Sequence, residues 1–410
     1  MSNKLFAVAS AIVLFAASLG GEANARSTQC PVGKAEVEAA TARARELVDF
    51  QTRAIDARVG RPGEYGFSVA VSACGEIVWA EGFGSADLEN DVPVTPQTKF
   101  RIGSVSKTLT AAAIGRLVDE GRLDLDAEVQ AYAPDFPRKT YPVTIRQLGG
   151  HLGGIRHYEG DEFLSATRYS SVSAALDIFK DDPLINRPGS AYVYSSYGWN
   201  LISAAIEGAS GDTFLDYMQA AVFDPAGMTA TTADHVEEIV AHRTRFYSYD
   251  VANDRTENAP FVDNSAKWAG GGFLSTPSDI LRFAAAMGTD RLVSAETYDI
   301  LTTSQTAAHG AATGYGIGWA VDMAPDRLND AARAFGPEVI AAARRAIGDA
   351  KAIGHTGGSV GGLTIFATFP DAPGDIAIAA TSNNSSYPPL FAFPAAAAFI
   401  AEARDVAERM

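Results

Sequence analysis

The stretch Phe100-Arg101-Ile102-Gly103-Ser104-Val105-Ser106-Lys107 is followed without a break by helix-forming residues that end near Gly121. Across 107–119, apolar side chains recur at the spacing of one helix face, at Leu109, Ala112, Ile114, Leu117 and Val118. The residues just before Ser104 are typical of an extended approach. We therefore predict an apolar helix that starts at Ser104 and places this serine at its N-terminus.

Ser104 and Lys107 stand three residues apart, so their side chains share one face of that helix. A serine hydroxyl becomes an effective nucleophile when a base takes its proton. A lysine can be that base if burial or nearby positive charge lowers the pKa of its amine. The four-residue pattern alone is weak, and its alternative is an N-capping Ser104 beside a solvated Lys107.

A second polar cluster lies in the loop Tyr194-Ser195-Ser196-Tyr197-Gly198, ahead of a predicted helix at 200–207. A tyrosine near a lysine can relay a proton, as phenol or as phenolate. Tyr194 is therefore a candidate catalytic residue. The alternative is a packed aromatic loop without a chemical role.

A third cluster, Gly354-His355-Thr356-Gly357-Gly358, precedes a predicted strand at 362–369. Its glycines would let a substrate backbone approach closely, with His355, Thr356 and Gly357 as candidate substrate contacts. A free N–H at Gly358 would complete an oxyanion hole with the N–H of Ser104. The alternative is a β-turn whose glycines serve backbone geometry only.

The overlapping segment Gly357-Gly358-Ser359-Val360-Gly361 also fits the nucleophile elbow of α/β-hydrolases. That elbow needs a helix directly after the serine, whereas a strand is predicted there. We therefore reject the α/β-hydrolase interpretation.

The predicted elements follow the order helix, strands, helical middle, strands, helix. Helices are predicted at 35–58, 173–179, 277–287, 330–350 and 394–408, a β-hairpin at 67–79, and further strands at 314–321 and 375–381. The fold class is therefore α/β of the α+β type. We expect one antiparallel sheet flanked by the N- and C-terminal helices (about 34–100 and 306–410), with an inserted, mainly helical lobe (about 101–305). A ligand site is expected between the two lobes.

The N-terminus has the pattern of an export signal: Lys4, an apolar run over 5–19, and the small residues Ala23-Asn24-Ala25. We expect residues 1–25 to be cleaved, which leaves a single catalytic domain over 26–410 in the periplasm or outside the cell. The alternative is an uncleaved anchor. No other segment approaches ~20 apolar residues, so no stable membrane insertion is expected after cleavage.

Export permits a disulfide between the only two cysteines, Cys30 and Cys74, and the alternative is two free thiols. The net charge of −16 and the lack of a basic run argue against nucleic acid as a partner. No metal motif, P-loop or dinucleotide fingerprint occurs, so we expect no metal and no cofactor. The expected partner is a small-molecule or peptide substrate, and the sequence does not indicate an oligomeric state.

The order of the three clusters, Ser-x-x-Lys, a tyrosine loop and a His-Thr-Gly segment, resembles the serine β-lactamase and penicillin-binding-protein superfamily over roughly residues 60–400. The likeness is greatest to the class C-like branch and, within it, to the mitochondrial serine β-lactamase-like proteins. Three more stretches resemble family landmarks: 121–126, 151–158 and 270–276. The resemblance implies a β-lactamase/transpeptidase-like fold, acylation of Ser104, proton handling by Lys107 and Tyr194, and an oxyanion hole at Ser104 and Gly358.

Two departures from the family pattern affect the expected substrate. Many members have asparagine where Ser196 stands, a substrate-binding position, and lysine where His355 stands. A lysine there is a permanent cation suited to a carboxylate, whereas histidine is mostly neutral at pH 7. If His355 contacts an anionic group, affinity should rise as the pH falls through ~6.5.

We therefore expect an exported serine hydrolase that forms an acyl-enzyme with a peptide, amide or ester, rather than an efficient β-lactamase. One alternative is a true β-lactamase or D,D-carboxypeptidase. The other is a non-catalytic binding or assembly protein on the same fold.

Overall fold

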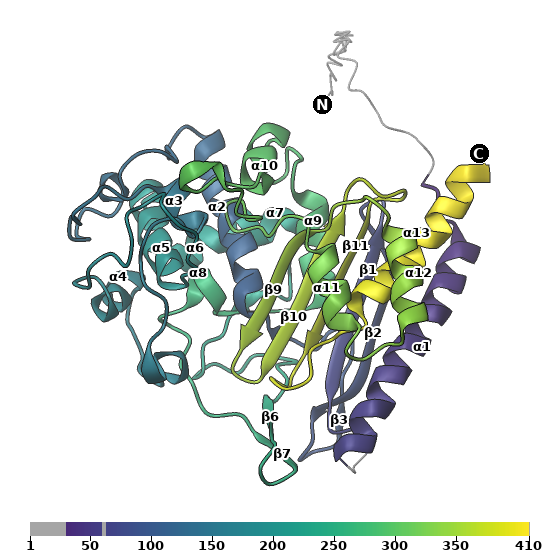
Figure 1. Ribbon diagram of the computed structural model, residues 1–410. Helices are drawn as coiled ribbons and strands as arrows, with labels where there is room; N and C mark the ends of the chain where they lie inside the picture. Colours follow the sequence, from purple (N-terminus) through teal and green to yellow (C-terminus); the bar gives the residue numbers. More distant parts are fainter. Residues whose placement is uncertain (1–29, 60–62, 410) are drawn as a thin grey trace, which may run out of the picture.

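The computed structural model describes residues 30–59 and 63–409, and its centre is an antiparallel sheet of six strands in the order β3-β2-β1-β11-β10-β9 (Figure 1). Their bounds are β1 Gly66–Ala73, β2 Glu76–Asp87, β3 Val92–Pro93, β9 Ile353–Ser359, β10 Gly362–Phe369 and β11 Ile376–Ser382. The two ends of the chain meet in the middle of the sheet, where β1 pairs with β11. The predicted α+β class with one antiparallel sheet is confirmed.

Successive side chains of the central strands point to opposite faces, and both faces are buried. In β1, Val69 and Val71 face one hydrophobic core and Ala70 faces the other. In β11, Ile376 and Ile378 share the first core, whereas Ala379 joins the second. A sheet covered on both sides needs apolar residues at nearly every position, which explains why these strands lack a polar face.

The terminal helices cover the first face. Helices α1 (Lys34–Val59) and α13 (Ala392–Arg409) lie beside α12 (Pro337–Ile347) and α11 (Ala324–Ala331), as Figure 1 shows. The single helix predicted over 330–350 is wrong, because the chain turns between α11 and α12. Pro337 takes the first position of α12, where its missing N–H costs no hydrogen bond.

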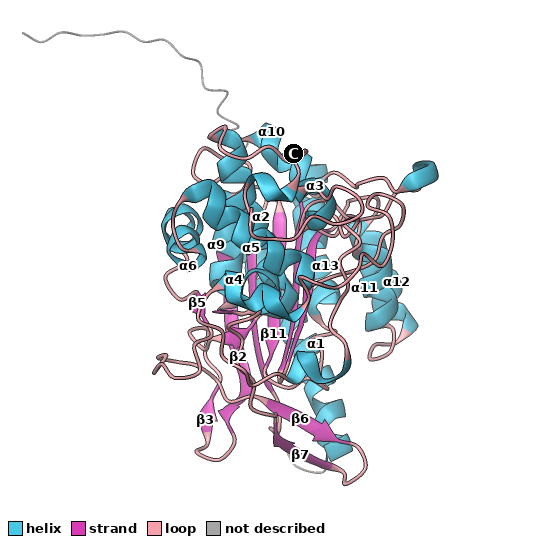
Figure 2. Cartoon of the chain, turned by 90° about the vertical axis from the view of Figure 1, so that its left-hand side faces the viewer, coloured by secondary structure: helices cyan, strands magenta, loops and turns pink. Residues whose placement is uncertain are grey.

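The residues between β3 and α11 cover the second face, seen from the helical side in Figure 2. Its helices are α2 Ser106–Asp119, α3 Ile145–Gly149, α4 Val172–Ala175, α5 Tyr197–Ser210, α6 Phe214–Met218, α7 Asp224–Ala226, α8 Trp268–Gly271, α9 Pro277–Ala286 and α10 Ala295–Thr302. A small sheet joins β4 (Phe100–Arg101), β8 (Phe273–Ser275) and β5 (Thr232–Ala233), and β6 (Tyr247–Asp250) pairs with β7 (Arg255–Asn258).

The strand predicted at 314–321 is wrong. This segment makes only isolated bridges, Tyr315 with Ala320 and Ala320 with Gly354. Gly314 and Gly318 have positive φ, and a Cβ at Gly318 would lie 2.8 Å from the Lys107 carbonyl oxygen. The segment is therefore a coil that lies directly against the start of α2. The residues 353–359, which the sequence left outside the sheet, form strand β9 instead.

Cys30 and Cys74 form a disulfide that ties the segment before α1 to the end of β1. The strand that follows Ser359 is β10, so no helix follows this serine and the rejection of the elbow is confirmed. The predicted signal over residues 1–25 lies outside the described residues. No helix among residues 30–59 and 63–409 combines the length and apolarity needed to cross a bilayer.

Candidate active site

Ser104 lies in a short 3-10 turn, η1 (Gly103–Val105), between strand β4 and helix α2. Gly103 has a φ of +51°, and a Cβ there would lie 2.7 Å from the backbone nitrogen of Gly358. Both features call for glycine, since a side chain at this position would be strained and would collide with β9. The turn leaves Ser104 partly exposed at the head of a buried helix.

Lys107 lies one turn further along and is fully buried. Its Nζ contacts three groups: the Gly270 carbonyl oxygen at 2.6 Å, the Ser104 Oγ at 3.1 Å and the Ser196 Oγ at 3.2 Å. A neutral amine has two N–H groups and one lone pair. It can donate to Gly270 and Ser196 and turn its lone pair to the Ser104 hydroxyl, which is the arrangement that proton removal requires.

Burial sets the protonation of this pair of catalytic candidates. Desolvation lowers the pKa of Lys107 from 10.5 to about 7, which makes a substantial fraction of the amine neutral at physiological pH. Desolvation raises the pKa of Tyr194 well above 10, although the hydrogen bond to Ser104 opposes this. Tyr194 is therefore a neutral phenol, and the phenolate alternative has no support.

Two histidines hold the loop that carries Tyr194. His151 Nδ1 accepts from the backbone N–H of Ser195, and His157 Nδ1 accepts from that of Ser196, each at 3.1 Å. The His151 ring also lies 4.1 Å from that of Tyr194. These contacts fix Tyr194 beside Ser104. Because Nδ1 of each ring accepts a hydrogen bond, each neutral imidazole carries its proton on Nε2.

Strand β9 brings the Gly358 backbone to the nucleophile. A Cβ at Gly357 would lie 1.9 Å from the Ile102 carbonyl oxygen and 3.3 Å from the Ser104 nitrogen, so β9 can pass here only with glycine. Ser104 and Gly358 both line one small pocket of about 160 Å³, together with Tyr194 and Ser196. Residues from three distant parts of the sequence thus converge on this pocket.

Comparison with known proteins agrees with this geometry. The family model described as Beta-lactamase matches residues 52–403. The chain belongs to the Beta-lactamase family. The mitochondrial serine β-lactamase-like protein LACTB of Homo sapiens is 37% identical over 298 residues, which cover 56% of this chain and 54% of the relative. The chain therefore spans about half the length of that curated relative.

Penicillin-binding protein 4* of Bacillus subtilis is 28% identical over 286 residues, covering 66% of this chain and 62% of the relative. Among solved structures, the octameric penicillin-binding protein homologue from Pyrococcus abyssi matches with a TM-score of 0.68 at 24% identity, covering 85% of this chain and 75% of that one. The D-amino acid amidase from Ochrobactrum anthropi matches with a TM-score of 0.66 at 22% identity, covering 89% and 100%. Both confirm the β-lactamase/transpeptidase-like fold.

Within this member of the Beta-lactamase family, His355 does not line the pocket that contains Ser104. It is 5% exposed, and its Nε2 lies 2.7 Å from the hydroxyl of Tyr315. Burial, and next the nearby Lys107, lower the pKa of His355 to about 3. His355 thus does not meet the condition for the expected rise in affinity as the pH falls through ~6.5, because it lies outside the pocket lining and is uncharged at that pH. Thr356 and Gly357 also lie outside the lining, and Gly357 serves the close passage of β9 past Ile102.

Several pocket residues were not singled out from the sequence. Tyr158, Asn264 and Lys267 all line the pocket, as does His157, which lies in the landmark stretch 151–158. The family landmark at 270–276 indicated this region, but not that the Gly270 carbonyl binds Lys107. Lys267 stands three residues before that glycine, so its place in the same stretch was the available signal.

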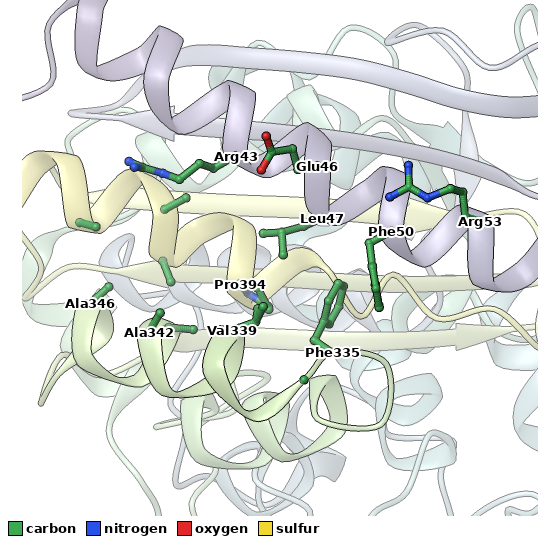
Figure 3. A pocket seen from close by; sticks show the side chains of 15 residues that line it. Arg43, Glu46, Leu47, Phe50, Arg53, Phe335, Val339, Ala342, Ala346 and Pro394 are labelled. Atoms are coloured by element: carbon green, nitrogen blue, oxygen red, sulfur yellow. The ribbon is translucent and has the colours of Figure 1, made fainter.

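A larger hollow of about 650 Å³ lies on the opposite face of the sheet, between α1, α12 and α13 (Figure 3). Its lining is mostly alkyl and aromatic, as with Leu47, Phe50 and Phe335, and its polar side chains are the arginines and glutamate of α1. It offers no serine, cysteine or histidine. Size alone would favour this hollow as the active site, but the chemistry lies in the smaller pocket.

Proposed function

We propose that the protein is an exported serine hydrolase that forms an acyl-enzyme on Ser104 with a peptide, amide or ester substrate. The observation that carries this proposal is the contact of the Ser104 hydroxyl with the buried amine of Lys107, whose pKa burial lowers to about 7. A buried, hydrogen-bonded lysine is costly to a fold when, as here among residues 30–59 and 63–409, no carboxylate pairs with it, and a role as base explains why it is there.

The proposed reaction begins when Ser104 Oγ attacks the substrate carbonyl carbon and its proton moves to Lys107 Nζ. The N–H groups of Ser104 and Gly358 stabilise the oxyanion of the tetrahedral intermediate. As the intermediate collapses, the C–N or C–O bond breaks and the proton passes from Lys107 to the leaving group, directly or through the Tyr194 hydroxyl. Water then attacks the acyl carbonyl carbon as neutral Lys107 takes its proton. The bond from that carbon to Ser104 Oγ breaks, the proton returns from Lys107 to Oγ, and the acid is released.

Throughout the reaction Ser196 and the Gly270 carbonyl keep Lys107 in place. The ammonium form has three donors for the same three partners that the amine contacts. Neither protonation state needs a rearrangement, so little free energy is spent on reorganisation between steps.

The neutral His355 supports the peptidase- or esterase-like proposal over efficient β-lactam hydrolysis. Its ring is hydrogen-bonded to Tyr315 and stays uncharged, so this position provides no cation for a β-lactam carboxylate. Export, with a periplasmic or secreted protein as its outcome, rests on the signal-like residues 1–25 and is part of the proposal.

Turnover on a mixed panel tests the proposal. The panel contains phenyl esters, D- and L-amino acid amides, D-Ala-D-Ala peptides and nitrocefin, each assayed with the wild type and with Ser104→Ala. We expect hydrolysis of esters or amides that falls at least about 10³-fold in the variant. Fast nitrocefin turnover or D-Ala release would favour the β-lactamase or carboxypeptidase alternative. Activity that survives the substitution, or no turnover of any substrate, would contradict the proposal.

A further inference from the structure

A lysine other than Lys107 is buried in the wall of the pocket that contains Ser104. Lys267 is 5% exposed and lines the pocket with Ser104 and Tyr194. Its Nζ donates to the Phe163 carbonyl oxygen at 2.7 Å. Within residues 30–59 and 63–409, no carboxylate lies within ion-pair distance of it. The Asp263 carboxylate acts on it only through space, raising its pKa slightly, and accepts from the Ser265 N–H.

One carbonyl satisfies one of the three donors of an ammonium group, so this cation is under-partnered. The rings of Phe163 and Tyr158 lie 5.1 and 5.8 Å from Nζ and add a weak attraction. Burial, and next the nearby Arg101, lower the pKa of Lys267 to about 8. The group is therefore still mostly protonated at pH 7. A buried charge in this state favours an anionic ligand.

The rest of the pocket agrees with that expectation. Among the described residues of its lining there is no aspartate, glutamate or arginine, although the whole chain has 49 acidic and 33 basic residues. Nearby Arg101 is already paired, since its Nε lies 2.7 Å from Asp234. Lys267 therefore gives a local positive field to an otherwise acidic molecule.

The backbone fixes Lys267 relative to the base Lys107. The Lys267 carbonyl oxygen accepts from the N–H of Gly270 at 3.1 Å and from that of Gly271 at 2.8 Å. The Gly270 carbonyl in turn accepts from Lys107 at 2.6 Å. A single turn of backbone thus holds both lysines, one beside the nucleophile and one in the wall of the pocket.

We propose that Lys267 binds a carboxylate of the substrate, carried within a few bonds of the carbonyl that Ser104 attacks. The proposal rests on the proposed function and names its substrate class: acyl donors with a nearby carboxylate. The pocket of about 160 Å³ is too small to separate the two groups widely.

Four esters test this proposal: phenyl pentanoate, the monophenyl ester of glutarate, and the 3-carboxyphenyl counterpart of each. Phenyl pentanoate has no carboxylate, the glutarate ester has one on the acyl side, and each 3-carboxyphenyl counterpart adds one on the leaving group. The readout is the ratio of kcat/KM for a carboxylated ester to that for phenyl pentanoate. We expect the wild type to favour at least one carboxylated ester, and that ratio to fall about 10- to 100-fold in Lys267→Met, the loss typical of a charge-assisted hydrogen bond.

Lys267→Gln is the matched control, because it keeps an N–H donor for Phe163 but removes the charge. We expect it to lose the carboxylate preference as the methionine variant does. If Lys267 only holds the Phe163 carbonyl, the glutamine variant will keep the wild-type ratio, and Lys267→Met will slow all four esters equally; either result would overturn the proposal. A wild type with no carboxylate preference would overturn it too.

The two proposals fail in different ways. If hydrolysis of phenyl pentanoate depends on Ser104 but the carboxylated esters are not preferred, only the proposed role of Lys267 is contradicted. If hydrolysis does not depend on Ser104, the proposed function is contradicted.

Discussion

Replacing Lys107 with methionine is expected to lower kcat/KM by about 10³- to 10⁴-fold, the cost of losing a general base whose nucleophile remains. Methionine has a similar length and fits the buried site, but it has no lone pair that can take the Ser104 proton. Initial rates on the best neutral ester from the substrate panel measure the effect. A loss below about tenfold would mean that another group is the base.

The pH profile of the wild type identifies the same base. Lysine acts as a base only when neutral, and burial lowers the pKa of Lys107 to about 7. For a neutral ester, kcat/KM should therefore rise as the pH increases through about 7 and then level off. Among the neighbours, His355 has a pKa lowered to about 3 and Tyr194 has one raised above 10, so neither titrates in this window. Lys267, with its pKa lowered to about 8, does titrate there, so the profile of Lys267→Gln is compared with that of the wild type. A flat profile between pH 5.5 and 8.5 would contradict the assignment.

Stability provides the control for the methionine variant. The folded-state pKa of about 7 lies below the unfolded value of 10.5, so between these pH values the unfolded chain binds more protons and wild-type stability rises with pH. Lowering the pKa of Lys107 from 10.5 to about 7 corresponds to roughly 5 kcal/mol of destabilisation of the wild type at low pH. The methionine variant avoids this cost but loses the hydrogen bond to the Gly270 carbonyl, which offsets part of the gain. At pH 7 the free energy of unfolding of Lys107→Met should thus be at least that of the wild type. By pH 10 the wild type should have gained stability relative to the variant.

Replacing Asp234 with alanine is expected to reduce the free energy of unfolding by about 3–5 kcal/mol, because it leaves a buried arginine without its partner. The Asp234 side chain is 1% exposed and accepts from Arg101 Nε at 2.7 Å, from Asn264 Nδ2 at 2.9 Å and from the less buried Arg243 Nη1 at 3.2 Å. Arg101 ends strand β4, just before the nucleophile turn, and donates to the Val360 carbonyl oxygen just after β9. The pair therefore joins the two segments that carry Ser104 and Gly358.

Urea unfolding at pH 7 measures this loss, and the double variant Arg101→Met with Asp234→Ala is its control. If the penalty comes from an unpaired buried cation, removing the cation should recover part of it, so the two substitutions will be non-additive. A loss below 1 kcal/mol for Asp234→Ala, or strictly additive effects, would show that the pair is not a determinant of this fold.

Periodicity in the sequence was enough to predict the long helices and the central strands. Helix 107–119 and strand 362–369 agree with α2 and β10 because apolar spacing decides such elements. The glycine-rich β9 was missed, since three glycines in seven residues have little strand propensity. Gly357 is needed because β9 passes against the Ile102–Ser104 turn, and Gly354 because a Cβ there would lie 2.1 Å from the Phe366 carbonyl oxygen; local sequence reveals neither contact.

In the candidate site, too, contacts set by local spacing could be predicted and contacts between distant residues could not. Ser104 and Lys107 are neighbours on one helix, so their contact follows from spacing alone. For Tyr194 the residues alone left a packed aromatic loop as the alternative, because the loop that carries it is fixed by the distant His151 and His157. Lys267 was not predicted at all. Its burial depends on Phe163, which lies about a hundred residues away along the chain.

The central claim is that Ser104 is the nucleophile, and three serines line the pocket: Ser104, Ser196 and Ser359. Labelling with a fluorophosphonate, followed by intact mass and peptide mapping, distinguishes them directly. We predict one adduct per chain, located on Ser104, absent from Ser104→Ala and formed much more slowly in Lys107→Met. A label on Ser196 or Ser359, or one that persists in Ser104→Ala, would contradict the account.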